Sequence, residues 1–161
     1  MPPIGWLADL SSAEDYFEDE RLETAAWDAV RAVDSAGLKA EKALLNAFNR
    51  LYYDPAYPLL PDGYASASAA QRVVLRKAQC EMAFYLCVHL ADEDRRKGLQ
   101  AQGVIKAGIV QEDYYADWLA KLPVPPFVDS LLAEFKDVHH VFVSNIDRDE
   151  NKSAKEKVHE F

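Results

Sequence analysis

Histidine and cysteine, the side chains best suited to binding a metal or to nucleophilic catalysis, are few and unfavourably spaced in this chain. There are four histidines and two cysteines. His139 and His140 are adjacent, so they point to different sides of a helix or a strand and do not suit a shared metal ion. Cys87 and His89 are two residues apart and face different directions on a helix, which disfavours a nucleophile–base pair. We therefore expect no metal, no cofactor and no catalytic site.

No disulfide is predicted between the two cysteines. Cys80 and Cys87 are seven residues apart, on roughly one face if the segment is helical. Their Cα atoms would then lie ~10 Å apart, too far for a disulfide. Buried free thiols are expected, as suits synthesis in a reducing cytoplasm. No HExxH, CxxC, EF-hand or Walker pattern occurs in the chain. These observations favour a protein that is not an enzyme.

Charge restricts the partners. The formal net charge is −9, and a field of that sign repels phosphate backbones. Acidic residues gather near the start of the chain against one basic residue, Arg21: Asp9, Glu14, Asp15, Glu18, Asp19, Glu20, Glu23 and Asp28. This cluster is explained by a solvated face, or by a surface that repels DNA or complements a basic partner.

Basic and aromatic residues do not form a nucleic-acid platform in the sequence. Arg72, Arg76 and Lys77 share one part of a predicted helix, and a second basic group, residues 95–97, is placed to complement a helix C-terminus. The three tryptophans do not alternate with basic residues as a surface for stacking single-stranded bases would. These observations disfavour single-stranded-DNA binding in replication, which we keep as the alternative function.

The elements that must position any functional surface are mostly helices. The length suits one domain, and half the residues are apolar. Apolar residues at three- and four-residue spacing predict helices over 15–20, 22–36, from 39 to before 55, 69–97 and 127–135. Capping boxes are predicted at Ser11–Glu14, before the first helix, and at Ser68–Gln71, before the fourth. The predicted apolar stripe of the third helix is Ala43, Leu44, Ala47, Phe48 and Leu51. Gly37 is expected to end the second helix, Gly98 the fourth, and Pro126 to begin the last. The predicted buried stripe of the second helix is Leu22, Ala25, Ala26, Ala29, Val30 and Val33.

Two further segments depart from the helical pattern. β-Branched runs on either side of Gly108 predict a small β-hairpin at about 103–113. Residues 136–161 are largely charged, apart from Val138 and the run Val141–Phe142–Val143, and predict an extended C-terminal arm that a partner holds in place. The predicted fold is thus mainly α, a bundle of about four to five helices over 1–135 with one hairpin and an arm.

No secretory signal or membrane span is predicted. The first residues have neither a basic start nor an apolar run. The longest apolar stretch, from Met82 to Val88, is far shorter than the ~20 residues that a membrane-spanning helix needs.

The order of these elements resembles a family of phage head-completion, or head-to-tail connector, proteins, some of which are labelled as primosomal single-stranded-DNA-binding proteins. The resemblance covers roughly residues 8–135 and rests on the order and spacing of several short segments. These are Ser12–Phe17, Ala25-Ala26-Trp27, a Leu-Tyr-Tyr helix end followed by a Pro-rich loop, Lys77–Ala83, the Val/Ile hairpin and Pro125–Leu132.

The resemblance implies a helical subunit that assembles with itself into a ring, typically a dodecamer, beneath the portal protein of the virion. Such a ring extends the DNA channel, and it offers a docking platform to the tail or the next neck protein. An acidic subunit suits a channel through which DNA slides without specific binding. We expect the hairpin and arm to make the subunit or portal contacts, through Val104, Ile105, Ile109, Val110, Val141, Phe142 and Val143.

Overall fold

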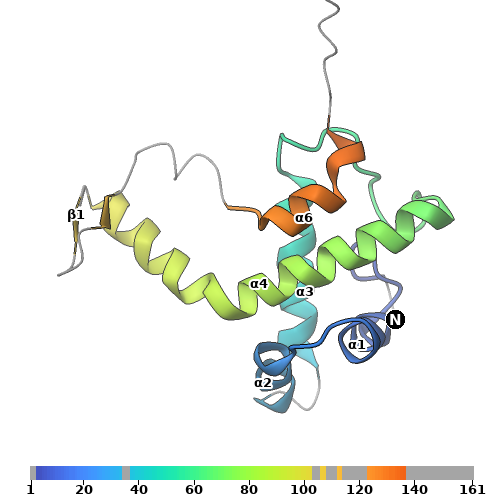
Figure 1. Cartoon of the computed structure of the whole chain (residues 1–161), viewed down its shortest axis with the longest axis horizontal. Helices are drawn as coiled ribbons and strands as arrows, with labels where there is room; N and C mark the ends of the chain where they lie inside the picture. Colours follow the sequence, from blue (N-terminus) through green and yellow to red (C-terminus); the bar gives the residue numbers. More distant parts are fainter. Residues whose placement is uncertain (1–2, 34–36, 103–105, 108–111, 114–122, 137–161) are drawn as a thin grey trace, which may run out of the picture.

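The computed structural model describes residues 3–33, 37–102, 106–107, 112–113 and 123–136. The prediction of a mainly α-helical protein is confirmed, with five α-helices in these ranges (Figure 1). They are α1 Leu10–Asp19, α2 Ala25–Val33, α3 Leu38–Tyr52, α4 Ala69–Ala101 and α6 Pro126–Leu131, followed by the 3-10 helix η1 Ala133–Phe135. The other four helices pack around α4, and its most extensive contacts are with α3.

The first helix begins earlier than predicted. Asp9, not Ser11, is its N-cap: the Asp9 Oδ1 accepts from the Ser12 backbone amide at 2.8 Å and from the Ser12 hydroxyl at 2.8 Å. These two hydrogen bonds lower the pKa of Asp9. The predicted capping box at Ser11 and Glu14 was wrong because Asp9 caps the helix through the Ser12 amide, which places Ser11 inside the first turn. The helix therefore runs over Leu10–Asp19.

The predicted buried stripe of α2 is confirmed only in part. Ala26 and Val30 are partly buried against the core, but Leu22 precedes the helix and is fully exposed, and Val33 is 71% exposed. The fully buried residue of α2 is Trp27, whose ring stacks on Phe17 of α1 at 4.4 Å. The periodicity of small and aliphatic residues did not include Trp27, because α2 lies at the edge of the body and buries most deeply the side that carries its largest ring.

Helices α3 and α4 form the centre of the fold. Ala40, Leu44, Ala47 and Leu51 face α4 as one buried stripe along α3. The predicted capping box at the start of α4 is confirmed: Ser68 accepts from the Gln71 amide, and the Gln71 side chain accepts from the Ser68 amide. The prediction that Gly98 ends this helix was wrong, because α4 continues to Ala101. Gly98 lies inside the last turns with open space around its Cα, so a glycine is tolerated there.

Gln79 links three segments inside the core. Its side chain is fully buried, accepts from the Trp6 amide at 2.9 Å, and donates to the Ile4 carbonyl at 2.9 Å and the Leu44 carbonyl at 3.0 Å. A buried amide is tolerated only when its polar atoms are paired. Gln79 thus fixes the N-terminal segment to α3 and α4.

The Pro-rich loop after α3 packs against α6 and η1. The Tyr57 hydroxyl donates to Asp129 of α6 at 2.6 Å, and the Leu59 amide donates to the Phe135 carbonyl at 3.2 Å. Pro126 occupies the start of α6, as predicted, but the last helix divides into α6 and η1. Figure 1 shows α6 and this loop at the C-terminal end of α3, with α2 at its N-terminal end.

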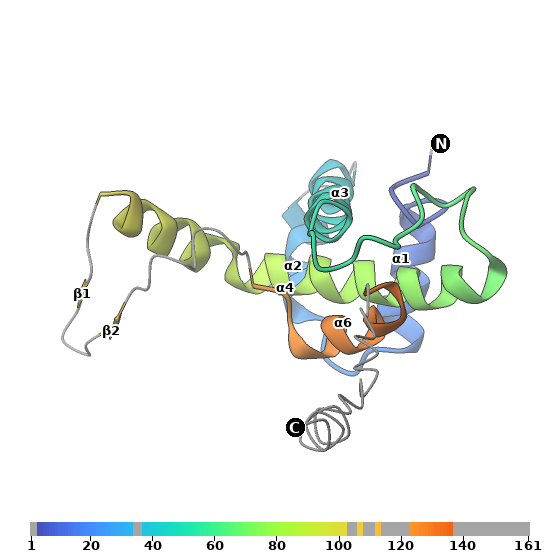
Figure 2. The same cartoon turned by 90° about the horizontal axis from the view of Figure 1, so that it is seen from above.

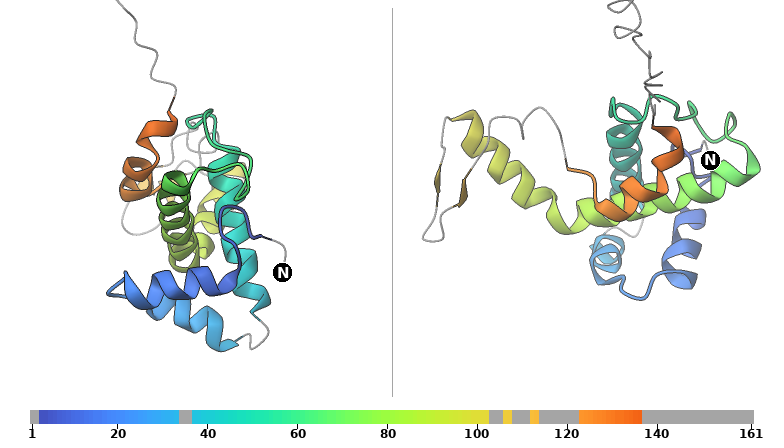
Figure 3. Two further views of the ribbon diagram at one scale, coloured as in Figure 1. Left: turned by 90° about the vertical axis from the view of Figure 1, so that its right-hand side faces the viewer. Right: turned by 45° about the horizontal axis from the view of Figure 1, so that its top comes forward.

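Beyond α4 the structure describes one short antiparallel strand pair, β1 Lys106–Ala107 with β2 Glu112–Asp113, in which Lys106 pairs with Asp113. Figures 2 and 3 show this pair beyond the C-terminal end of α4, away from the helical body. The apolar residues of the predicted hairpin, and residues 137–161 of the predicted arm 136–161, lie outside the described residues. Both features therefore remain predictions.

Candidate assembly surfaces

A buried ion pair holds α4 against α3 just before α4 leaves the body. The Arg50 guanidinium donates to both carboxylate oxygens of Glu93, at 2.8 and 2.9 Å. The two side chains are only 6% and 9% exposed. Burial opposes ionisation of Glu93, but hydrogen bonds from Arg50 and Tyr85 outweigh it and lower the Glu93 pKa. Two parallel charge-assisted bonds define geometry more strictly than a single contact does.

The same arginine also holds the point where the chain returns to the body. One Arg50 nitrogen donates to the Pro123 carbonyl at 2.8 Å. Glu93 precedes and Pro123 follows the segment that carries the predicted hairpin, so a single side chain fixes both approaches to it. We call Arg50, Glu93 and Pro123 the clamp. The sequence did not reveal it, because Arg50 and Pro123 are 73 residues apart.

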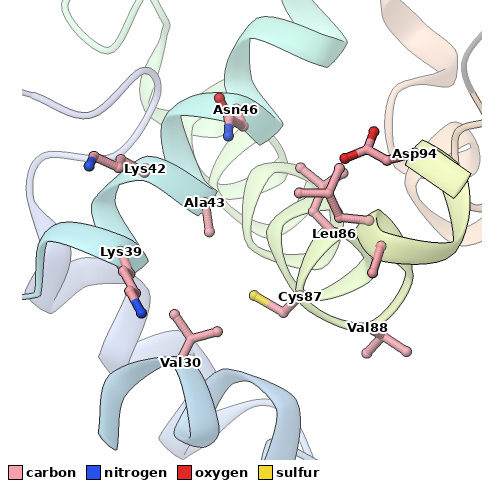
Figure 4. A pocket seen from close by; sticks show the side chains of 11 residues that line it. Val30, Lys39, Lys42, Ala43, Asn46, Leu86, Cys87, Val88 and Asp94 are labelled. Atoms are coloured by element: carbon pink, nitrogen blue, oxygen red, sulfur yellow. The ribbon is translucent and has the colours of Figure 1, made fainter. Parts of the chain in front are cut away.

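An open groove of about 490 Å³ lies between α2, α3 and the C-terminal half of α4 (Figure 4). Apolar side chains supply most of its lining: Val30, Ala43, Leu86, Cys87, Val88 and Leu90. Of these, Val88 is 46% and Leu90 39% exposed. Lys39 and Lys42 border one side of the groove and Asp94 the opposite side (Figure 4). We call this feature the α2–α3–α4 groove.

Further exposed apolar side chains lie on α2 and α3, the helices that border the groove. Leu38 and Leu45 lie four residues before and three residues after Lys42, on the outer side of α3, and are 56% and 46% exposed. Val33 of α2, one turn from Val30, is 71% exposed. Contiguous exposed apolar surface with a polar rim is typical of protein–protein contact. The sequence carried a signal for it, since α4 is apolar on more sides than its neighbours can cover.

The predicted acidic face divides into paired and exposed members. Glu14 pairs with Arg31, and Glu20 binds both Arg76 and Lys77 of α4. Exposed carboxylates remain on α1 and α2: Asp15, Glu18, Asp19 and Asp28. The structure therefore keeps an acidic surface here, while part of the predicted cluster serves folding.

The first basic group takes part in contacts within the fold. Arg76 and Lys77 bind Glu20, and Arg72 donates to the Tyr64 and Ala67 carbonyls at 3.1 and 3.0 Å. The second group, residues 95–97, was expected at a helix C-terminus, yet α4 continues to Ala101. Lys97 instead approaches Glu93 at 3.5 Å.

Perturbed titratable groups in the described ranges have structural causes. Burial, with a hydrogen bond to Glu93, raises the pKa of Tyr85 to about 12. Burial also raises the pKa of Cys80, and both cysteines are free thiols. Across the described ranges, no three His, Cys, Asp or Glu residues are grouped so that they could hold a metal ion. No helix in those ranges is long and apolar enough to cross a membrane.

The residues predicted to make subunit or portal contacts all lie outside the described residues. They are Val104, Ile105, Ile109, Val110, Val141, Phe142 and Val143. Two other features emerge from the described residues. One is the clamp, whose Glu93 and Pro123 lie on either side of the first four of these residues in the chain, and the other is the α2–α3–α4 groove.

Comparisons with known proteins give no match to this chain among family models, curated proteins or solved structures.

Proposed function

We propose that this chain is a structural subunit of a tailed phage's neck, assembling as a ring between the portal protein and the tail. The observation that carries the proposal is the extension of α4 beyond the helical body, with the pair β1–β2 at its far end (Figures 1 and 2). Strands held away from their own core contribute little to it. Their free edges suit pairing with a neighbouring subunit.

The way that extension is anchored at its base supports the same proposal. Arg50 binds Glu93 at the exit from the body and Pro123 at the return. A projecting element is useful for assembly only when its direction is set, because ordering it upon contact costs conformational entropy. The clamp meets that requirement from inside the body.

Charge supports a role around DNA rather than on it. The chain has a formal net charge of −9, and the exposed carboxylates of α1 and α2 repel a phosphate backbone. Arg72, Arg76 and Lys77 are engaged with Tyr64, Ala67 and Glu20. A ring of such subunits allows DNA to pass without specific binding, and this arrangement argues against single-stranded-DNA binding.

The described part of the chain also supports a non-enzymatic role. Its strongly shifted groups are tyrosines and a cysteine whose perturbation arises first from burial. The phenols of Tyr16 and Tyr57 donate to Glu81 and Asp129, which are contacts between elements of the fold. Groups used in acid–base catalysis would converge on a cavity with pKa values near neutrality.

Electron microscopy of the virions that carry this protein tests the proposal. We expect a ring of this subunit below the portal, and purified protein mixed with the portal should add density at the same place. Absence of the subunit from the particle would refute the neck assignment. A salt-sensitive shift of labelled oligonucleotides at nanomolar protein would then favour the replication role.

A second experiment tests the predicted contacts. Truncation after Lys136, which retains the Lys136–Asp129 contact of 2.7 Å, should leave the helical body folded and impair docking. The hairpin substitutions Ile105→Asp and Ile109→Asp should impair ring formation with unchanged circular dichroism. Full assembly by the truncated protein would contradict the role proposed for Val141, Phe142 and Val143.

A further inference from the structure

Two apolar features of this chain lack a described partner. One is the α2–α3–α4 groove, in which Val88 and Leu90 are 46% and 39% exposed. The other is Val141–Phe142–Val143, the one run of three apolar residues in the polar arm 137–161. Each is costly to leave in water, and a phenylalanine flanked by β-branched residues is a suitable anchor for an apolar groove.

Charge on one side of the groove complements the end of the arm. Lys39 and Lys42 border one side of the groove and Asp94 the other (Figure 4). In the arm, Asp137, His139 and His140 precede the apolar run, and Asp147, Arg148, Asp149 and Glu150 follow it, so the stretch that follows is acidic on balance. An arm that lies with this acidic stretch at the two lysines brings opposite charges together.

The arm of the same subunit has little chain to spare for this groove. It starts after Lys136, where the Phe135 carbonyl accepts from Leu59, beyond the C-terminal end of α3. The groove is lined by residues 39–46, in the N-terminal half of α3. Val143 lies seven residues past Lys136, at most about 25 Å of fully extended chain. The path back along α3 takes ~10–20 Å of that reach, so an arm of the same subunit must be nearly extended to enter the far end of the groove, whereas the arm of a second copy is under no such restriction.

We infer that the α2–α3–α4 groove binds the Val141–Phe142–Val143 run of a second copy of this chain. This inference rests on the proposed function in that a ring supplies the neighbouring copy. Each subunit then receives one arm and donates one, a head-to-tail contact that closes into a ring when the rotation per subunit allows it. Such an exchange explains why the groove and the arm are both present in one chain.

The native Cys87 in the groove allows a direct test with the full-length chain. A donor carrying Ser144→Cys, which keeps the Val141–Phe142–Val143 run intact, and Cys87→Ala is mixed with tagged wild-type acceptor and oxidised with diamide. Because burial raises the pKa of Cys87, the reaction is run at alkaline pH. We expect a disulfide-linked dimer of donor and acceptor. A Val158→Cys, Cys87→Ala donor and a Cys87→Ala acceptor serve as controls that should not form it.

A matched pair of substitutions tests the groove itself. Val88→Glu in the acceptor should lower the yield of linked dimer about tenfold, the effect of losing one well-buried apolar contact. Leu22→Glu, at a fully exposed leucine outside the groove, should leave the yield unchanged.

Several results would overturn the inference. They are equal linkage from the Val158→Cys donor, an intramolecular link within a chain that carries Ser144→Cys and native Cys87, preferential linkage from an Ile109→Cys donor, or no linkage at all. The outcomes also separate the two proposals. Ring density beneath the portal without cross-linking refutes the arm contact alone. Cross-linking without neck density refutes the neck assignment and leaves a self-association groove.

Discussion

Replacing Arg50 by methionine should strongly destabilise the protein, because it leaves the Glu93 carboxylate without its main partner in a site that is 9% exposed. Removing one member of a buried ion pair costs ~3–5 kcal/mol. Lys97 lies 3.5 Å from the same carboxylate and offers partial compensation, so we expect a loss near the lower limit, about 3 kcal/mol. For a chain of this size, that loss lowers the Tm by roughly 6–12 °C.

The double substitution Arg50→Met, Glu93→Met makes this prediction specific. With both charges gone and apolar side chains of similar length in their place, stability should return to within about 1 kcal/mol of wild type. Thermal unfolding followed by helical circular dichroism at neutral pH measures all variants. If the double variant is as unstable as Arg50→Met, the loss comes from Arg50 packing or its bond to Pro123, and the ion-pair reasoning is refuted.

Three further outcomes are expected. Gln79→Leu, which leaves the buried Trp6 amide without an acceptor and removes two further hydrogen bonds, should lower the free energy of unfolding by about 2–4 kcal/mol in a urea titration. Tyr57→Phe removes the hydroxyl bond to Asp129, whose side chain is 44% exposed, and should cost about 1 kcal/mol in the same titration. The folded-state pKa of Glu20 is lowered from 4.5 by its lysine and arginine partners, so its contribution is present above that pH and lost as the pH falls through the lowered value. Glu20→Gln should therefore reduce the acid-side loss of Tm.

Matched controls accompany these variants. Gln102→Leu, at an exposed glutamine at the end of α4, and Tyr53→Phe, at a tyrosine that is 75% exposed, should change stability by less than about 0.5 kcal/mol. A cost for either control equal to that of its buried counterpart would contradict the burial argument. An unchanged acid profile for Glu20→Gln would mean that the ion pairs with α4 do not persist in solution.

The proposed assembly links these local contacts to function. We propose that the Arg50 clamp, which binds Glu93 of α4 and the Pro123 carbonyl, sets the direction of α4 beyond the body and so the place at which β1 and β2 are presented. A clamp variant that stays folded at low temperature should therefore assemble less well than its stability predicts. Comparing Arg50→Met with the equally destabilised Gln79→Leu in the portal-binding experiment separates lost direction from lost stability.

Local signals in the sequence determined several elements of this protein. Ser68 and Gln71 predicted the start of α4, Pro126 the start of α6, and the spacing of Leu44 and Leu51 the buried side of α3. These contacts join atoms within one or two helical turns, so the residues that decide them are neighbours in the chain. The fold class followed from the same short-range patterns.

Tertiary structure decided what those patterns could not. Asp9 displaced Ser11 as the N-cap of α1, and Gly98 did not stop α4. Arg50 met Pro123, 73 residues away, and Gln79 met Ile4, 75 residues away. Which polar group is buried, and which apolar stripe stays exposed, depends on the elements that pack against it. The α2–α3–α4 groove arises from that packing, and no short stretch of the sequence contains it.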